Sequence, residues 1–324
     1  MDAALFLADL EQKPATMRAA ADALANGHWQ WPISEAPRRV VLIGMGSSLF
    51  AAQVAALRMR SAGVLAFAEA GSAERMLPVT AADLVVGISA GGTSVETNSL
   101  FTHAAAATSV ALTNTAGSPI TVGADATMLL VADPERGGVA CRSYTHTLIA
   151  LLQLEVLLTG HDIGLAQRVQ QAADATTYLL ESRVNWLSQA TTIVDGPHGS
   201  WMLAPLERSA SAAQSALMMR ECPRRPAVGC ETGDWSHVDV YLTRTLDYRA
   251  VVFPGSRWDQ QAADWLVKRN SQVLAVGGEF SGAALTIRYP GDHDPLVRLL
   301  TETIIIEVVA ATLWSTTTFA QEHP

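Results

Sequence analysis

The sequence predicts an α/β protein made of two tandem doubly wound domains, each built on a parallel sheet. Short apolar runs typical of buried strands alternate with helical stretches of about 10–15 residues, and the same alternation restarts in the second half. The chain has 324 residues, 49% of them hydrophobic, which suits two domains of about 150 residues each. We expect a first domain over 1–165, including N-terminal helices, and a second over 175–324.

The elements of the first half follow from this alternation. We expect two short helices within 1–27, separated at Pro14, because a proline removes a helical hydrogen bond. The apolar runs then predict strands at 39–43, 83–88, 109–113 and 126–131. Helices are expected at 51–61, 95–107 and 144–158, the last ending at Gly160. This order is typical of a parallel sheet covered by helices on both faces.

The second half repeats the pattern. Strands are expected at 191–194, 238–242, 249–253 and 272–276, and a helix at 203–220. The most apolar stretch, 304–314, contains Glu307 and predicts a buried helix. No uninterrupted run of 18 apolar residues occurs, so we expect no membrane span.

Composition excludes several classes of function. The formal net charge is −9, which argues against nucleic acid as a partner. Acidic residues near the start argue against a signal peptide, so we expect a cytoplasmic protein that does not bind membranes. The three cysteines, Cys141, Cys222 and Cys230, show no C-x-x-C spacing, and the histidines are scattered. We therefore expect neither a metal site nor a cofactor.

Two Gly/Ser-rich loops are the strongest functional signal. Residues 44–48 and 89–94 each follow an apolar strand and precede a helix. Each alone could be an ordinary helix cap. Together, at the ends of neighbouring strands, they predict an anion site in one crevice. The candidate residues are the glycines that let the backbone turn and the hydroxyl donors, namely Gly46, Gly91, Gly92, Ser47, Ser48, Ser89 and Ser94.

These loops resemble the G-x-G-[ST]-S turn and the I-S-x-S-G-x-[ST] phosphate loop of SIS (sugar isomerase) domains. Residues 11–14 and 134–140 resemble segments of the isomerase half of glucosamine-6-phosphate synthase. The resemblance covers almost the whole chain and implies two tandem SIS domains of flavodoxin-like topology that bind a phosphorylated sugar. Gly91 stands where the phosphate loop has its middle serine, and Cys141 or its neighbour replaces a serine in a third phosphate-contacting segment.

The resemblance also suggests an acid–base pair, Glu221 and His237. They lie sixteen residues apart, as the corresponding pair does in the synthase. Without the resemblance, Glu221 would be interpreted as a solvated carboxylate at a helix end and His237 as an ordinary loop histidine. Such a pair can move a proton between C1 and C2 of a sugar, or open its ring. In the family the histidine loop often completes the site of a neighbouring subunit, which implies a homodimer.

Departures from the synthase favour a deglycase-like reaction. Gln214 and Met218 stand where the synthase helix has Glu and Lys, and the chain ends at Pro324, before the family's segment with an active-site lysine. We therefore expect an enzyme acting on an amino- or fructosamine-type hexose 6-phosphate, with isomerisation coupled to amine removal or exchange.

Two alternative functions and one reserve site residue stay open. The protein could be an aldose–ketose isomerase without amine chemistry. It could instead be a non-catalytic phosphosugar-sensing module, although the sequence contains no helix-turn-helix extension of the kind joined to such modules. His198, in an expected strand-to-helix turn, is a reserve candidate for the site.

Overall fold

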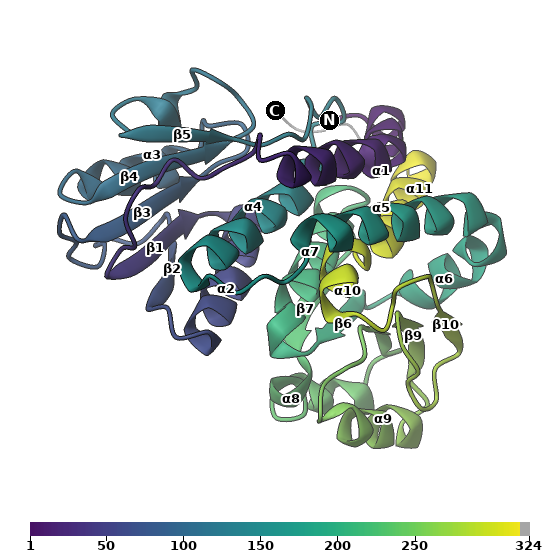
Figure 1. The fold of residues 1–324 in the computed structure, drawn as a ribbon. Coiled ribbons are helices and arrows are strands. Elements are labelled where there is room, and N and C mark those ends of the chain that lie inside the picture. Colours follow the sequence, from purple (N-terminus) through teal and green to yellow (C-terminus); the bar gives the residue numbers. More distant parts are fainter. Residues whose placement is uncertain (318–324) are drawn as a thin grey trace, which may run out of the picture. The chain divides into compact units, whose positions relative to one another are not determined.

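The computed structural model describes residues 1–317 and contains two compact units (Figure 1). The first-sheet unit comprises residues 13–135 and 140–173. The second-sheet unit comprises 1–12, 136–139 and the chain from residue 174 onward. Residues 318–324, which include the chain end at Pro324, lie outside the described residues. The domain division at 165–175 stays a prediction.

The first-sheet unit holds five parallel strands in the order β2-β1-β3-β4-β5. The strands are β1 (Arg39–Gly44), β2 (Ala66–Ala70), β3 (Asp83–Ile88), β4 (Thr108–Thr113) and β5 (Ala126–Leu129). The helices that follow within this unit are α2 (Gly46–Ser61), α3 (Val95–Phe101) and α4 (Arg142–Thr159). Gly160 ends α4 in the left-handed conformation, as expected. The strand order reverses between β1 and β3, which is the topological switch point of a flavodoxin-like sheet.

The second-sheet unit repeats this topology. Its parallel strands lie in the order β10-β9-β8-β6-β7, which is the same 2-1-3-4-5 pattern when counted within the unit. The strands are β6 (Ser200–Ala204), β7 (Ala227–Glu231), β8 (Arg249–Val252), β9 (Gln272–Val276) and β10 (Leu285–Ile287). The helices are α6 (Leu187–Val194), α7 (Ser209–Glu221), α8 (Thr232–Trp235), α9 (Asp259–Lys268), α10 (Pro295–Thr301) and α11 (Ile304–Thr316). Two doubly wound parallel sheets confirm the predicted fold class.

Two strand predictions in this unit were wrong. Residues 191–194 are the end of α6, because its buried residues Ala190, Ile193 and Val194 recur at helical spacing. Residues 238–242 fall mostly in a 3₁₀ helix, Asp239–Arg244, which buries Val240 and Thr243 only. Short apolar runs fit either element, so these segments were ambiguous from sequence.

The helix boundaries were also corrected. A single helix, α1 (Ala3–Ala25), continues through Pro14. Burial of Phe6, Leu10 and Met17 on this helix offsets the hydrogen bond that the proline removes. The polar stretch after α4 is itself helical, as α5 (Leu165–Glu181). Helix α2 begins at Gly46, five residues before its expected start.

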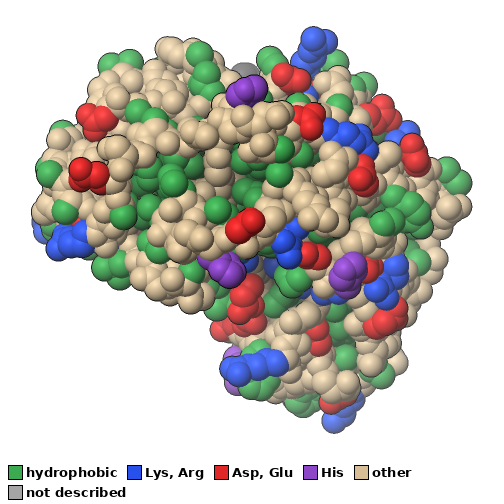
Figure 2. Space-filling model, in the orientation of Figure 1, with side chains coloured by type: hydrophobic (Ala, Val, Ile, Leu, Met, Phe, Trp, Pro, Cys, Tyr) green, Lys and Arg blue, Asp and Glu red, His purple; other side chains and the backbone are tan. Residues whose placement is uncertain are grey.

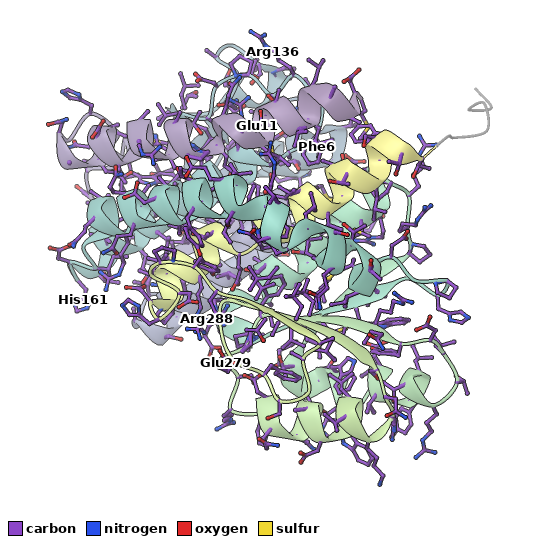
Figure 3. All side chains as sticks on the ribbon, turned by 90° about the vertical axis from the view of Figure 1, so that its right-hand side faces the viewer. Phe6, Glu11, Arg136, His161, Glu279 and Arg288 are labelled. Atoms are coloured by element: carbon purple, nitrogen blue, oxygen red, sulfur yellow. The ribbon has the colours of Figure 1, made fainter. Side chains whose placement is uncertain are left out.

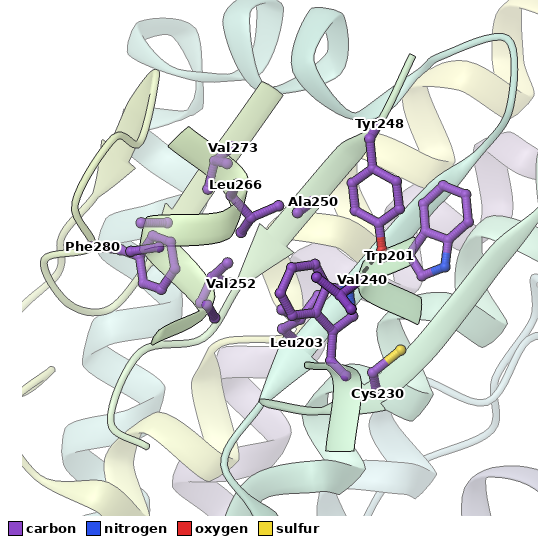
Figure 4. Close-up of a cluster of buried hydrophobic side chains, with 14 residues drawn as sticks. Trp201, Leu203, Cys230, Val240, Tyr248, Ala250, Val252, Leu266, Val273 and Phe280 are labelled. Atoms are coloured by element: carbon purple, nitrogen blue, oxygen red, sulfur yellow. Dashed lines mark hydrogen bonds between the residues drawn. The ribbon is translucent and has the colours of Figure 1, made fainter. Parts of the chain in front are cut away.

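The second sheet is packed on both faces. On one face a cluster of buried side chains includes Trp201 and Cys230 from the strands and Trp235 from α8 (Figure 4). Trp235 Nε1 donates to the Tyr248 hydroxyl at 2.7 Å, and the Tyr248 ring stacks on Trp201 with centroids 4.2 Å apart. Burial raises the pKa of Tyr248, so its hydroxyl stays a neutral partner of the indole.

Helix α7 covers the opposite face of this sheet. A Cβ built on Gly229 of β7 would lie 2.8 Å from the Cα of Ala213 in α7, whereas the next residue, Cys230, points into the cluster of Figure 4. Successive residues of a strand face opposite sides of the sheet. Helix α11 packs against α7 and α6, so α6, α7 and α11 share one face while α8 and α9 share the other (Figure 1).

The apolar stretch near the end of the described chain is a buried helix, as expected. Glu307 of α11 is fully buried and accepts a hydrogen bond from Thr303 Oγ1 at 3.1 Å. Within residues 1–317, no helix is both long and apolar enough to cross a membrane. On the face shown in Figure 2, acidic and basic side chains are interspersed rather than gathered by sign.

Candidate functional site

The two Gly/Ser-rich loops of the first-sheet unit leave the sheet side by side. Strands β1 and β3 are adjacent and parallel, and Ile43 pairs with Gly87, so both strands end at the same edge. The segments 44–48 and 89–94 therefore start next to each other at the switch point. This is the place where open α/β sheets bind their ligands.

The start of α2 presents unused hydrogen-bond donors. Its N-cap, Met45, has extended backbone and no side-chain cap, and Gly46 adopts a positive φ of 49° that favours glycine. Among residues 1–317, no acceptor lies within bonding distance of the Gly46 and Ser47 N–H groups or of the Ser47 and Ser48 hydroxyls. Ser47 and Ser48 thus lie in the first helical turn, where the helix dipole favours an anion.

The second loop offers one buried hydroxyl and one that is already engaged. Ser89 is 7% exposed, and its Oγ accepts the Ser94 N–H at 3.5 Å, which leaves its proton to donate. Ser94 is the N-cap of α3, and its Oγ accepts from Thr97 N at 3.3 Å. It also lies 3.2 Å from Glu96 Oε2. Ser89 is therefore the better placed donor of the two.

The glycines of this loop differ. Gly92 has a φ of 69°, and a Cβ there would overlap the Ser118 hydroxyl, so only glycine fits. Gly91 is exposed, lies outside the left-handed region, and would bring its Cβ no closer than 3.6 Å to Thr93 Oγ1. The position of the missing serine hydroxyl is thus open space.

In the third expected phosphate-contacting segment, a carboxylate of the chain already accepts from the backbone N–H groups. The Glu135 carboxylate caps α4, accepting from the N–H groups of Cys141 at 2.7 Å, Arg142 at 2.6 Å and Ser143 at 3.1 Å. Its second oxygen accepts from Ser143 Oγ at 2.6 Å. Cys141 is fully buried. These amides already hold an anion, which leaves the two glycine loops as the candidate phosphate site.

The switch point of the second-sheet unit is filled by guanidinium groups. Arg208, just after β6, donates to the Glu302 carboxylate and to the Pro254 carbonyl. Arg298 of α10 donates to the same carbonyl at 2.8 Å. Burial raises the pKa of Glu302 against the pull of Arg208. Farther along this edge, Arg288 pairs with Glu279 at 3.0 Å (Figure 3). The loop after β8 contains Gly255 and Ser256, but a Cβ on Gly255 would lie 2.8 Å from the Arg208 guanidinium, and the Gly255 N–H donates to Asp259 Oδ2 at 2.6 Å. This loop is thus occupied by the chain's own groups, so the two units are not equivalent.

The structure does not bring Glu221 and His237 together within one chain. Glu221 ends α7, and the next residues lie beside the start of β6, where Arg225 pairs with Asp195 at 2.9 Å. His237 is exposed and follows α8. Because α7 and α8 cover opposite faces, the second sheet lies between the two side chains. Their catalytic roles stay a prediction.

The reserve candidate His198 was placed wrongly. It precedes β6 in a helix-to-strand turn, at the amino edge of the sheet, and its Nδ1 accepts the Asp247 N–H at 3.2 Å. Ligands bind outside the carboxyl ends of parallel strands. His198 is therefore at the wrong edge for the site.

Sequence reasoning missed the residues that hold the second loop. Thr113 Oγ1 and Asn114 N donate to the Ala90 carbonyl at 3.1 and 2.9 Å. Asn98 Nδ2 and Ile120 N donate to the Gly92 carbonyl at 3.1 and 3.0 Å. A signal existed: Thr113 ends β4, the neighbour of β3, so it had to lie at the same edge.

Comparisons with known proteins agree with this fold. Residues 33–157, which include both glycine loops, match the family model of the SIS domain. No curated protein sequence matches the chain significantly. Among solved structures, the C-terminal domain of glucosamine-fructose-6-phosphate aminotransferase from Francisella tularensis is similar, with a TM-score of 0.82 and 16% identity over 97% of both chains.

Two further structures share the fold. Tagatose-6-phosphate ketose/aldose isomerase from Escherichia coli has a TM-score of 0.75 at 17% identity, over 95% of this chain and 92% of that one. Glucosamine-6-phosphate deaminase from Thermotoga maritima has a TM-score of 0.71 at 13% identity, over 96% and 94%. At these identities the similarity establishes the fold.

Proposed function

We propose that this protein is a cytoplasmic enzyme that binds a hexose 6-phosphate carrying an amine and couples isomerisation to removal or exchange of that amine. The observation that carries the proposal is the pair of loops at the β1/β3 switch point. They combine donors without acceptors among residues 1–317 with a match to the SIS domain. The similar structures include a domain of a glucosamine-fructose-6-phosphate aminotransferase and a glucosamine-6-phosphate deaminase.

In this proposal the phosphate lies between the two loops. The hydroxyls of Ser47, Ser48 and Ser89 donate to it, and Ser94 contributes after releasing Glu96. Neither loop contains a charged residue. Binding thus depends on backbone and hydroxyl dipoles and on the start of α2.

The chemistry is assigned to Glu221 and His237, and the second-sheet unit is proposed to be a second SIS domain. Glu221 takes the proton next to the carbonyl or imine carbon. Water then adds to the imine carbon and the C–N bond breaks, with His237 protonating the departing amine; in ring opening, His237 protonates the ring oxygen instead. Since the sheet separates them in one chain, we propose a homodimer in which the His237 of one copy serves the Glu221 of the other.

Binding of glucosamine 6-phosphate by calorimetry tests the phosphate site, with glucosamine as the unphosphorylated control. A hydrogen bond to a charged group contributes about 1.5–3 kcal/mol, so Ser89→Ala weakens binding about tenfold or more and leaves folding intact. Equal affinity for the two sugars would refute the phosphate site.

Release of free amine from glucosamine 6-phosphate or a phosphorylated fructosamine tests the reaction. Interconversion of a ketose and an aldose 6-phosphate without amine release would favour the isomerase alternative, for which the similarity to the tagatose-6-phosphate enzyme is the supporting observation. Binding without any turnover would instead indicate a phosphosugar sensor.

A further inference from the structure

The hydrogen bonds around the phosphate loop give its peptide groups a defined direction. The Ala90 carbonyl accepts from Thr113 Oγ1 at 3.1 Å and Asn114 N at 2.9 Å. Both donors belong to the end of β4 and the residue after it. The Ala90 carbonyl therefore points from the end of β3 towards β4.

The peptide group between Gly92 and Thr93 is held in the same way. The Gly92 carbonyl accepts from Asn98 Nδ2 at 3.1 Å and Ile120 N at 3.0 Å. Asn98 comes from α3, and Ile120 from the short 3₁₀ helix Pro119–Thr121 after β4. Ser118, also after β4, packs against the Cα of Gly92.

The direction of these carbonyls fixes that of two amides. In a planar trans peptide, the C=O of one residue and the N–H of the next point in opposite directions. The N–H groups of Gly91 and Thr93 therefore point away from the β4 side. Since β3 lies between β4 and β1, the Gly91 amide points to the β1 side, where α2 starts. Gly91 and Thr93 are exposed, and neither amide has an acceptor among residues 1–317.

We propose that Thr113 and Asn98 are positioning residues that turn the Gly91 and Thr93 amides towards the ligand's phosphate. This proposal rests on the proposed function. It explains how the loop can bind a phosphate although position 91 is a glycine, because two oriented N–H groups supply the hydrogen-bond donors that a serine side chain would otherwise supply. The Gly91 and Thr93 amides lie two residues apart, with the Gly92 N–H between them donating to the Ser89 carbonyl at 3.0 Å; backbone N–H groups directed to one point can hold an anion without any charged side chain.

The Thr113 hydroxyl can be separated from its packing role. Thr113 is fully buried, and Thr113→Val keeps its shape while removing both the donor to Ala90 and the acceptor of the Thr115 N–H at 3.2 Å. Thr113→Ser keeps the donor and removes a methyl group. A positioning role predicts that the Val variant binds glucosamine 6-phosphate about tenfold more weakly and that the Ser variant binds like wild type. A role in packing alone predicts that Ser is the more damaging change.

Asn98 and its neighbour Ser99 provide a second pair of test and control variants. Asn98→Leu removes the amide donor at similar volume, and Ser99→Ala changes an exposed neighbour on the same helix. We expect Asn98→Leu to weaken binding several-fold and Ser99→Ala to leave it unchanged. In NMR titrations of the wild type, the Gly91 and Thr93 amide protons should move downfield on adding glucosamine 6-phosphate. In Thr113→Val and Asn98→Leu, these shifts should shrink.

Two outcomes overturn the proposal, and they differ. If wild type binds and the Val and Leu variants bind equally well with unchanged amide shifts, positioning is refuted while the proposed function stands. If wild type binds neither glucosamine 6-phosphate nor inorganic phosphate, the phosphate site itself is refuted, and positioning with it.

Discussion

Replacing Gly91 by serine should tighten binding of a sugar phosphate. The structure leaves room for the side chain: a Cβ at this position meets only Thr93 Oγ1, at 3.6 Å, and the backbone is outside the left-handed region. The added hydroxyl would stand at the place of the serine in the phosphate loop of SIS domains. A hydrogen bond to a charged group contributes about 1.5–3 kcal/mol, which corresponds to about 10- to 100-fold in affinity.

The matched controls isolate the hydroxyl. Gly91→Ala adds the same Cβ without a donor, so its affinity for glucosamine 6-phosphate should stay close to wild type. Gly92→Ser is the steric contrast, because its Cβ would overlap the Ser118 hydroxyl and its φ of 69° disfavours any side chain. That variant should lose binding.

Calorimetry with glucosamine 6-phosphate, and with glucosamine as the reference, measures these differences. The decisive comparison is between the Ser and Ala variants at position 91. If Gly91→Ser binds no more tightly than Gly91→Ala, the phosphate does not lie against this loop in the proposed way. If Gly91→Ala alone abolishes binding, the ligand needs the space that the structure shows as open.

Three further predictions follow from particular residues. Light scattering should show at least a dimer, and a concentration-independent monomer of about 34 kDa would exclude the shared site. Glu221→Gln and His237→Asn should each lower turnover about 10²–10⁴-fold; mixed and reassociated, they should recover about a quarter of wild-type activity, because half the dimers carry one intact site. No recovery, with mixed dimers shown to form, would contradict a site shared between copies. His146 is fully buried on α4, and burial, with the charges of Lys13 and Arg142, lowers its pKa to about 3. Below about pH 6.5 the unfolded chain therefore binds a proton at this histidine that the folded chain does not bind. The free energy of unfolding decreases as the pH is lowered, by about 2 kcal/mol at pH 5. Urea unfolding at pH 7 and 5 should show this loss in wild type and a smaller one in His146→Leu; equal losses would assign the acid sensitivity to other groups.

The sequence by itself predicted the fold class and the place of the candidate phosphate site. Apolar runs such as 39–43 and 272–276 identify buried parallel strands, because such strands are covered on both faces and need no polar alternation. The same alternation predicted the place of the two glycine loops, because each loop joins the end of an apolar strand to the start of a helix. Such local patterns can be recognised from the sequence because they depend on residues that are neighbours in the chain.

Only the tertiary structure decided which local options were used. Residues 191–194 could be strand or helix, and packing within the second-sheet unit made them the end of α6. Helix α1 runs through Pro14 because burial of its apolar residues outweighs one lost hydrogen bond. The sixteen-residue spacing of Glu221 and His237 says nothing of the sheet that separates them, because which face a crossover covers depends on pairings between strands far apart in the sequence. The hydrogen bond from Thr113 to the second glycine loop likewise depends on strand order, because β4 lies beside β3.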